Sequence, residues 1–210
     1  MRMSLRAAAL AIGSGIGLLA CYPEQPTESG DLASVVTLYD VSFQFGDAAT
    51  YYIVIPDSVV HLGPAGGSDP FDHTYDSLIV ARTAANMNVR GYTRVLDPAT
   101  ADLILSPAVL VTNNYDFESV DWCVVWGWAY PGCAGWVPDY PTDVVGYEYS
   151  AGTIIIPMAD ATVAAPPVVW NAALNGVLNG NTPGSLAAAI TDGIDQAFSQ
   201  STYLYHTATP

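Results

Sequence analysis

The chain of 210 residues is strongly acidic, with 20 Asp and Glu against five Lys and Arg and a net charge of −15. A surface of this charge repels phosphate backbones, which argues against nucleic acid as a partner. The acidic residues are scattered singly, as is typical of a solubilising surface rather than an interaction tail. The chain is long enough to bury the core of one domain.

The first residues predict export and lipidation. Arg2 and Arg6 precede an apolar stretch over residues 7–20, which ends in Leu-Leu-Ala before Cys21. This stretch of 14 residues suits a secretory signal and is shorter than the roughly 20 that a spanning helix needs. The junction resembles the lipobox of bacterial lipoproteins, in which the cysteine is lipidated. We expect a signal peptide over residues 1–20 and a lipid on Cys21; an ordinary signal peptide or an uncleaved helix is the alternative.

The predicted anchor implies a place in the cell envelope. Residues 21–31 are polar and contain prolines, as expected of a tether. By the sorting of enteric lipoproteins, Tyr22 rather than aspartate after the cysteine favours the outer membrane. We therefore expect an outer-membrane lipoprotein, with its periplasmic or surface side left open.

Strand patterns recur in the rest of the chain. The expected strands are residues 35–45, 50–55, 92–96, 102–112, 144–157 and 168–178. In the last of these, Trp170, Ala172 and Leu174 lie at alternate positions, which is the period of a strand. Trp170 is therefore expected in the core.

Two helices are expected between and after these strands. The first begins near Thr74 and ends before Gly91, and its apolar positions are Tyr75, Leu78, Ala81, Ala85 and Val89. The second has Thr182 as cap and Pro183 at its first position, and its apolar positions are Leu186, Ile190, Ile194, Ala197 and Phe198. This order predicts a single α+β domain over residues 32–200, followed by a tail over 201–210. The domain is expected to have two layers, a mainly antiparallel sheet with both helices packed on one face.

Two cysteines remain after Cys21, and both lie in an aromatic segment over residues 113–141. Cys123 and Cys133 are close in sequence with a Pro-Gly pair between them, and an exported protein lives where disulfides persist. A zinc site would need further ligands, which no nearby histidine supplies. We expect a disulfide, with two unpaired thiols as the alternative.

The same segment holds four of the five tryptophans. The residues of interest are Trp126, Trp128, Tyr130 and Trp136, which glycines and prolines separate. Large aromatic rings on a loop suit glycan stacking or protein recognition. The alternative is that they cover the sheet as a small additional core.

Short motifs along the domain together resemble one family. They are residues 36–40 (Val-Thr-Leu-Tyr-Asp), 50–52 (Thr-Tyr-Tyr), 56–59 (Pro-Asp-Ser-Val), 90–92 (Arg-Gly-Tyr), 101–103 (Ala-Asp-Leu), 149–155 (Tyr-Ser-Ala-Gly-Thr-Ile-Ile), 160–161 (Asp-Ala) and 169–170 (Val-Trp), with Phe43 and Phe45. This set resembles the bacterial lipoprotein family catalogued as domain of unknown function 4136. The resemblance implies an envelope lipoprotein with an α+β fold and implies no reaction. Asn171 stands where members often carry a basic residue, and the cysteine pair is not a family hallmark.

Acidic residues and a histidine crowd the start of the first helix. Asp69, Asp72, His73 and Asp76 lie where exposed N–H groups favour negative charge, so we interpret them as helix caps. A calcium site is the alternative, although the spacing of an EF-hand is absent. Asp160 is likewise interpreted as a turn residue.

No motif indicates catalysis, a metal or a cofactor, and we expect none of the three. His61, His73 and His206 form no metal-ligand spacing. The leading interpretation is a non-enzymatic envelope lipoprotein with a structural or partner-binding role. The alternatives are a glycan- or peptidoglycan-binding module that uses the aromatic segment, and a hydrolase whose site no motif marks. The expected partners are the membrane, through Cys21, and a glycan or an envelope protein.

Overall fold

The computed structural model describes residues 34–54, 59–63, 69–71, 73–111, 151–163, 166–179 and 183–207. Several predicted sites lie outside the described residues, namely Cys21, Cys123, Cys133, Trp126, Trp128, Tyr130 and Trp136. Their predicted roles therefore stay predictions. Within the described part, no helix is both long and apolar enough to cross a membrane.

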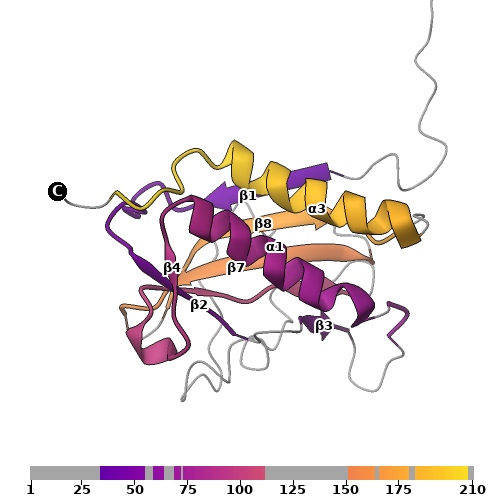
Figure 1. The fold of residues 1–210 in the computed structure, drawn as a ribbon, viewed down its shortest axis with the longest axis horizontal. Coiled ribbons are helices and arrows are strands. Elements are labelled where there is room, and N and C mark those ends of the chain that lie inside the picture. The colour runs from indigo at the N-terminus through magenta and orange to yellow at the C-terminus, as the bar shows by residue number, and fades with distance from the viewer. Residues whose placement is uncertain are drawn as a thin grey trace, which may run out of the picture.

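The described residues form one mixed sheet with two α-helices (Figure 1). The strands are β1 (Ser34–Tyr39), β2 (Thr50–Ile53), β3 (Val60–Leu62), β4 (Thr93–Arg94), β5 (Leu103–Leu105), β6 (Ala108–Leu110), β7 (Thr153–Asp160) and β8 (Val168–Asn175). The helices are η2 (His73–Tyr75), α1 (Asp76–Val89), η3 (Pro98–Thr100) and α3 (Pro183–Gln200). This arrangement confirms the predicted α+β class.

The sheet is built around the antiparallel pair β7 and β8. Its strand order is β1-β8-β7-β5-β2-β4, and β3 joins it through β6. The pairs of β1 with β8 and of β5 and β6 with β7 are also antiparallel. In contrast, β2 is parallel to β4 and β5, and β3 is parallel to β6. The sheet is thus mainly antiparallel, as predicted, with a parallel part that the sequence did not reveal.

The predicted strand over residues 102–112 is in fact two strands. β5 ends at Leu105 and β6 begins at Ala108, because Pro107 has no N–H to donate to a strand ladder. Between them, the N–H of Ser106 donates to the carbonyl of Pro157 at 3.1 Å. Both short strands pair with the same edge of β7. On their other sides, β5 pairs with β2 and β6 pairs with β3, in both cases in parallel.

The predicted strand over residues 35–45 ends early, at Tyr39. The carboxylate of Asp40 accepts hydrogen bonds from the N–H and the hydroxyl of Ser42, at 2.8 and 2.7 Å. This local pairing turns the backbone away from the extended path. The strand is therefore shorter than its apolar pattern suggests.

Helices α1 and α3 lie side by side on one face of the sheet (Figure 1). Arg82 of α1 donates to both carboxylate oxygens of Asp195 on α3. The main core lies between the helices and the sheet, where Trp170 and Phe198 are fully buried. The other face of the sheet is also apolar and buried, through Val54, Leu62, Ile104, Ala108, Leu110, Ile155, Ala159, Val168 and Ala173. Both faces of the sheet therefore contribute to the burial of apolar surface that drives folding.

The buried face of α3 is the predicted one. Ile190, Ile194, Ala197 and Phe198 are fully buried, and Leu186 packs against the same core. In β8, which ends at Asn175 rather than at the predicted residue 178, Trp170, Ala172 and Leu174 belong to the main core, as their alternate spacing predicts, and Ala173 belongs to the core on the other face.

The predicted buried face of α1 is only partly right, because Tyr75 and Leu78 pack against the core and the other three predicted positions do not. Ala81 and Ala85 are exposed, and Val89 is 78% exposed. The residues that α1 buries are Asp76, Ile79, Val80, Thr83, Ala84 and Met87. Two of these are polar, so they break the apolar periodicity on the side of the helix that faces the core.

Residues 201–207, which the sequence assigned to a tail, lie against the domain. Leu204 is fully buried, and the hydroxyl of Ser201 accepts a hydrogen bond from Nε1 of Trp170 at 2.9 Å. The N–H of Thr207 donates to a backbone carbonyl in the turn after β1 at 3.1 Å. The packed unit therefore extends to Thr207.

Candidate metal centre

Two histidines and two aspartates converge beside the N-terminus of α1. His61 lies on β3, Asp69 precedes η2, His73 begins η2, and Asp76 is the first residue of α1. β3 holds His61 in place through its parallel pairing with β6, in which His61 is opposite Val109. The sheet and the helix thus bring together residues that lie up to 15 positions apart in the chain.

The two imidazole rings stack, and a carboxylate faces each end of the stack. The ring centroids are 4.0 Å apart and the planes meet at 28°. At one end, Oδ2 of Asp69 lies 2.5 Å from Nδ1 of His61 and 3.6 Å from Nε2 of His73. At the other end, Oδ1 of Asp76 lies 3.2 Å from Nε2 of His61, and its Oδ2 lies 2.9 Å from Nδ1 of His73. Each imidazole nitrogen therefore faces a carboxylate oxygen.

The two ends of the stack differ in exposure. The side chains of Asp76 and His61 are 5% and 7% exposed, whereas those of Asp69 and His73 are 30% and 63% exposed. A buried carboxylate requires hydrogen-bond partners, and the N–H of Val59 donates to Oδ2 of Asp76 at 3.3 Å. The Asp76 end is therefore fixed and dry, and the Asp69 end is open to solvent.

The interpretation of Asp76 as a helix cap is wrong. The N-cap of α1 is Tyr75, which makes no side-chain cap hydrogen bond, and the carboxylate of Asp76 faces the imidazoles instead. Asp69 does bind local backbone, because its Oδ1 accepts from the N–H of Phe71 at 2.9 Å. Asp72 lies outside the described residues.

Sequence reasoning grouped Asp69, His73 and Asp76, with a calcium site as the alternative, but missed His61, which comes from a separate element. His61 lies alone on a strand of three residues, and its spacing from His73 matches no ligand motif. The pair of His73 and Asp76 was visible as neighbours one turn apart at a helix start. Only the position of β3 adds the second imidazole.

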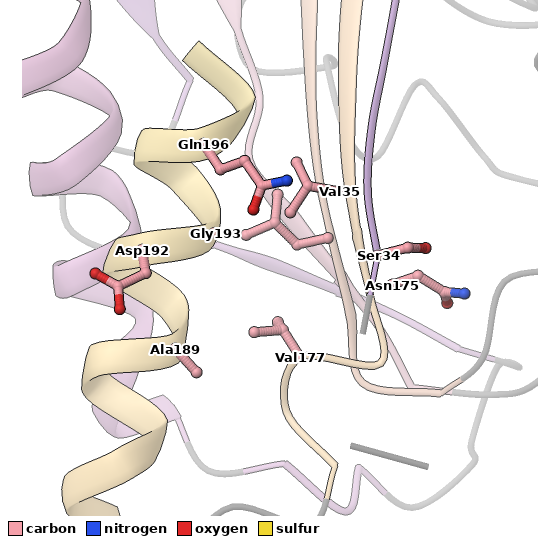
Figure 2. Close-up of a pocket in the computed structure, with 9 residues that line it drawn as sticks. Ser34, Val35, Asn175, Val177, Ala189, Asp192, Gly193 and Gln196 are labelled. Atoms are coloured by element: carbon pink, nitrogen blue, oxygen red, sulfur yellow. The ribbon is translucent and has the colours of Figure 1, made fainter. Parts of the chain in front are cut away.

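A hollow of about 180 Å³ lies where α3 crosses the edge of the sheet (Figure 2). Figure 2 shows the amide of Gln196 pointing toward Val35 across it. A Cβ added at Gly193 would lie 2.8 Å from Cδ2 of Leu174, so the helix approaches β8 closely here. The lining carries a single carboxylate, that of Asp192, so it offers no cluster of groups for chemistry.

Another hollow, of about 190 Å³, is lined by acidic residues that the fold itself uses. Oδ2 of Asp102 accepts hydrogen bonds at 2.9 Å from the N–H of Ala49 and from the N–H and hydroxyl of Thr50. Burial acts to raise the pKa of Asp102, but these hydrogen bonds outweigh it and hold the pKa below its ordinary value. Asp160 accepts from the N–H and hydroxyl of Thr162, as expected of a turn residue.

The motif at residues 90–92 is likewise engaged in the fold. Gly91 has a φ of +88°, which lets the chain turn sharply after α1. The hydroxyl of Tyr92 donates to the carbonyl of Phe45 at 3.0 Å, and burial raises the pKa of this hydroxyl. The guanidinium of Arg90 lies 5.0 Å from the ring centre of Phe198, within the range of a cation–π contact.

Residues 35–201 match the sequence model of the family described as Domain of unknown function (DUF4136). The chain belongs to this family. A crystal structure of a DUF4136 family protein from Bacteroides thetaiotaomicron VPI-5482 is similar, at 24% identity and a TM-score of 0.58, over 83% of this chain and 98% of that one. At this identity the likeness shows the fold alone.

Two further solved structures are more distant. The PelC dodecamer from Paraburkholderia phytofirmans is 14% identical with a TM-score of 0.40, over 83% of this chain and 99% of that one. A PDZ domain protein from Parabacteroides distasonis ATCC 8503 is 13% identical with a TM-score of 0.44, over 81% of this chain and 36% of that one. None of the curated proteins matches the chain.

The four residues of the candidate metal centre lie inside the DUF4136 region, yet none belongs to the motifs that carry the family resemblance. The motif residues Arg90, Gly91, Tyr92, Asp102 and Trp170 are engaged in packing, turns and hydrogen bonds of the fold. The centre therefore uses residues other than those of the resemblance motifs.

Proposed function

We propose that this DUF4136 protein is a non-enzymatic lipoprotein of the bacterial envelope, with a structural or partner-binding role. The observation that carries the proposal is the short apolar stretch that ends in Leu18, Leu19 and Ala20 before Cys21. One acyl chain holds a protein to a membrane only marginally, so stable anchoring needs at least two. Processing at a lipobox supplies them on a single cysteine.

The distance between the anchor and the domain suits such a protein. Twelve residues, 22–33, separate Cys21 from the start of β1. At roughly 3.3–3.6 Å per residue they span at most about 40 Å. The chain after Cys21 carries all 20 acidic residues and only three arginines, so anionic headgroups repel it. A domain on this tether can stand off the bilayer and meet a partner.

The chemistry of the described residues supports a role without catalysis. A general base must present a lone pair to the proton that it removes. In the stack of His61 and His73, carboxylates face the nitrogens at both ends. The family motif residues Asp102 and Trp170 are bonded within the fold. Among the described residues, the groups that face these two imidazoles are therefore carboxylates, which suits a structural or binding role.

We further propose that the protein resides in the outer membrane, because Tyr22 follows the cysteine. Its partner is a glycan or an envelope protein, and the aromatic residues Trp126, Trp128, Tyr130 and Trp136 are the sequence-based candidates for recognising it. Wide aromatic rings contribute large contact areas to either kind of partner.

Metabolic labelling with a fatty acid tests the anchor. The wild-type chain and a Cys133→Ala control should both take up the label, whereas Cys21→Ala should not. Equal labelling of wild type and Cys21→Ala would overturn the lipoprotein proposal. Sucrose-gradient fractionation tests the address, and recovery of the labelled protein in the inner membrane would refute it.

A further inference from the structure

We propose that His61, Asp69 and His73 bind one divalent transition-metal ion, represented by Zn²⁺, and that Asp76 positions the two imidazoles for it. The ligand atoms are Nδ1 of His61, Nε2 of His73 and Oδ2 of Asp69. This inference goes beyond the proposed function, which assigns no ion to the protein.

Asp76 determines which imidazole nitrogens can bind an ion. An ionised carboxylate only accepts hydrogen bonds, so the nitrogens that face it carry protons. These are Nε2 of His61 and Nδ1 of His73, at 3.2 and 2.9 Å from the Asp76 oxygens. Oδ2 of Asp69 faces the other two nitrogens, Nδ1 of His61 and Nε2 of His73, so an ion that binds at this end takes the place of any proton held between them and Asp69. Metal-ligating histidines almost always donate their other N–H to a carboxylate or carbonyl in this manner.

The three ligand atoms are already gathered at that end. One ligand atom from each of His61, Asp69 and His73 lies within 4.8 Å of the other two. Bonds of about 2.0–2.1 Å in a tetrahedron place neighbouring ligand atoms roughly 3.3–3.4 Å apart. Nε2 of His73 and Oδ2 of Asp69 are 3.6 Å apart, close to this value. Nδ1 of His61 and Oδ2 of Asp69 are 2.5 Å apart without the ion. These two atoms would have to move apart by about 0.8–0.9 Å to reach the tetrahedral spacing.

The donor set selects the class of ion. Two imidazoles with one carboxylate suit Zn²⁺ and other first-row transition ions, whereas Ca²⁺ and Mg²⁺ take oxygen ligands. An ion bound between the two imidazoles has two carboxylates beside it, those of Asp69 and Asp76, and such groups favour a cation. The acidic chain adds a long-range attraction for cations.

The exposure of the centre leaves room for a fourth ligand. The Asp69 end is open to solvent, and most of the His73 side chain is exposed. Three protein ligands with one open position is the arrangement in which zinc holds a water molecule or an incoming group. The dry Asp76 end, in contrast, keeps the imidazoles oriented.

Calorimetric titration with Zn²⁺ alone tests the inference. The sample is the mature chain from residue 21 with Cys21→Ser, without an affinity tag or reductant. We expect one Zn²⁺ per chain and no binding of Ca²⁺. His73→Ala should weaken binding by at least the roughly 10- to 100-fold that loss of an outer-shell group costs. Asp69→Asn should do the same. Because the His73 side chain is exposed, its variant should keep the circular dichroism spectrum of the folded protein.

Three further variants separate this site from others. His206→Gln removes the remaining histidine and should bind Zn²⁺ as the wild type does, and so should the double variant Cys123→Ser, Cys133→Ser. In Asp76→Asn, the amide N–H faces one of the two imidazoles, and that imidazole must then accept at the nitrogen that faces residue 76. Its proton moves to the nitrogen that should bind the ion, so Zn²⁺ binding should weaken by roughly 10- to 100-fold. Asp76→Glu, which keeps the carboxylate, should recover part of that loss.

Absence of stoichiometric Zn²⁺ binding by the wild-type chain would overturn the inference, and the four residues would then serve the fold alone. If His73→Ala binds Zn²⁺ as tightly as the wild type, or if only the double cysteine variant loses binding, the ion lies elsewhere in the chain. Either result would also overturn the inference. Unchanged affinity in Asp76→Asn would remove the positioning role. Since the measurement uses unlipidated protein, these results are independent of the lipoprotein proposal.

Discussion

Replacing Ser201 with alanine should destabilise the domain through a single lost hydrogen-bond acceptor. The hydroxyl of Ser201 is fully buried, accepts from Nε1 of Trp170 at 2.9 Å, and donates to the carbonyl of Ala197 at 2.9 Å. Alanine leaves the buried N–H of Trp170 without this partner, and an unsatisfied buried polar group costs about 1–3 kcal/mol. The hydroxyl of Tyr203, 3.4 Å from Oγ of Ser201, can take over part of this role. We therefore expect a loss of about 1–2 kcal/mol.

Urea unfolding of the soluble chain from residue 31 onward, followed by far-ultraviolet circular dichroism, measures this loss. With a slope of about 2 kcal/mol per molar urea, the midpoint should fall by roughly 0.5–1 M. Ser199→Ala is the matched control. Ser199 lies two residues earlier, near the end of α3, is exposed, and its hydroxyl donates to the nearby carbonyl of Gln196 at 2.9 Å. The free energy of unfolding of Ser199→Ala should stay within about 0.5 kcal/mol of the wild-type value.

The same substitution in a Trp170→Phe background identifies the cause. Phenylalanine has no N–H, so no donor is orphaned when Ser201 becomes alanine, and the cost of that second change should shrink. An equal cost in both backgrounds would refute the hydrogen-bond explanation. Identical midpoints for Ser201→Ala and Ser199→Ala would show that the residues after α3 do not pack as described.

Two other features give direct tests. Asp102 has a lowered pKa when folded, so its contribution to stability is complete above about pH 4 and is lost as the pH falls through the folded-state pKa. Urea midpoints between about pH 2 and 6 should therefore fall less steeply with acid in Asp102→Asn than in wild type, and parallel curves would contradict this. Gly91 has a φ of +88°, so Gly91→Ala should cost about 1–2 kcal/mol in a thermal melt. Gly184→Ala, where an added Cβ meets nothing within 4 Å, should be neutral or slightly stabilising, and equal melting temperatures for the two variants would disprove the backbone argument.

The parts of the fold that sequence reasoning predicted are those where apolar residues alone define the pattern. In α3, Ile190, Ile194 and Phe198 recur at helical spacing, and all three are buried. In α1, the buried face includes Asp76 and Thr83, whose polar side chains are satisfied or enclosed only in the folded state. Counting apolar residues therefore found Tyr75 and Leu78 but assigned three exposed positions, Ala81, Ala85 and Val89, to the buried side of that helix.

Prediction also failed where one residue or a distant partner determines the outcome. Pro107 divides an unbroken apolar run into β5 and β6, because a single missing N–H interrupts the ladder. The candidate metal centre needs His61, which the parallel pairing of β3 with β6 brings to the start of α1. No spacing along the chain encodes that pairing, so the place of His61 beside Asp69, His73 and Asp76 became visible only in three dimensions.

The pairing of β1 with β8 makes the N-terminal strand of the sheet depend on the completeness of the chain. Ser34 is in register with Asn175, 141 positions later, and β8 is the partner of β1 among the described strands. Joining such distant segments carries a loop-closure cost and makes folding slow compared with local pairing. A chain that is synthesised from its N-terminus holds β1 unpaired until β8 has emerged. The first strand of the sheet is thus secured by almost the last strand-forming segment to emerge, and a chain cut short before β8 would leave β1 with an open strand edge.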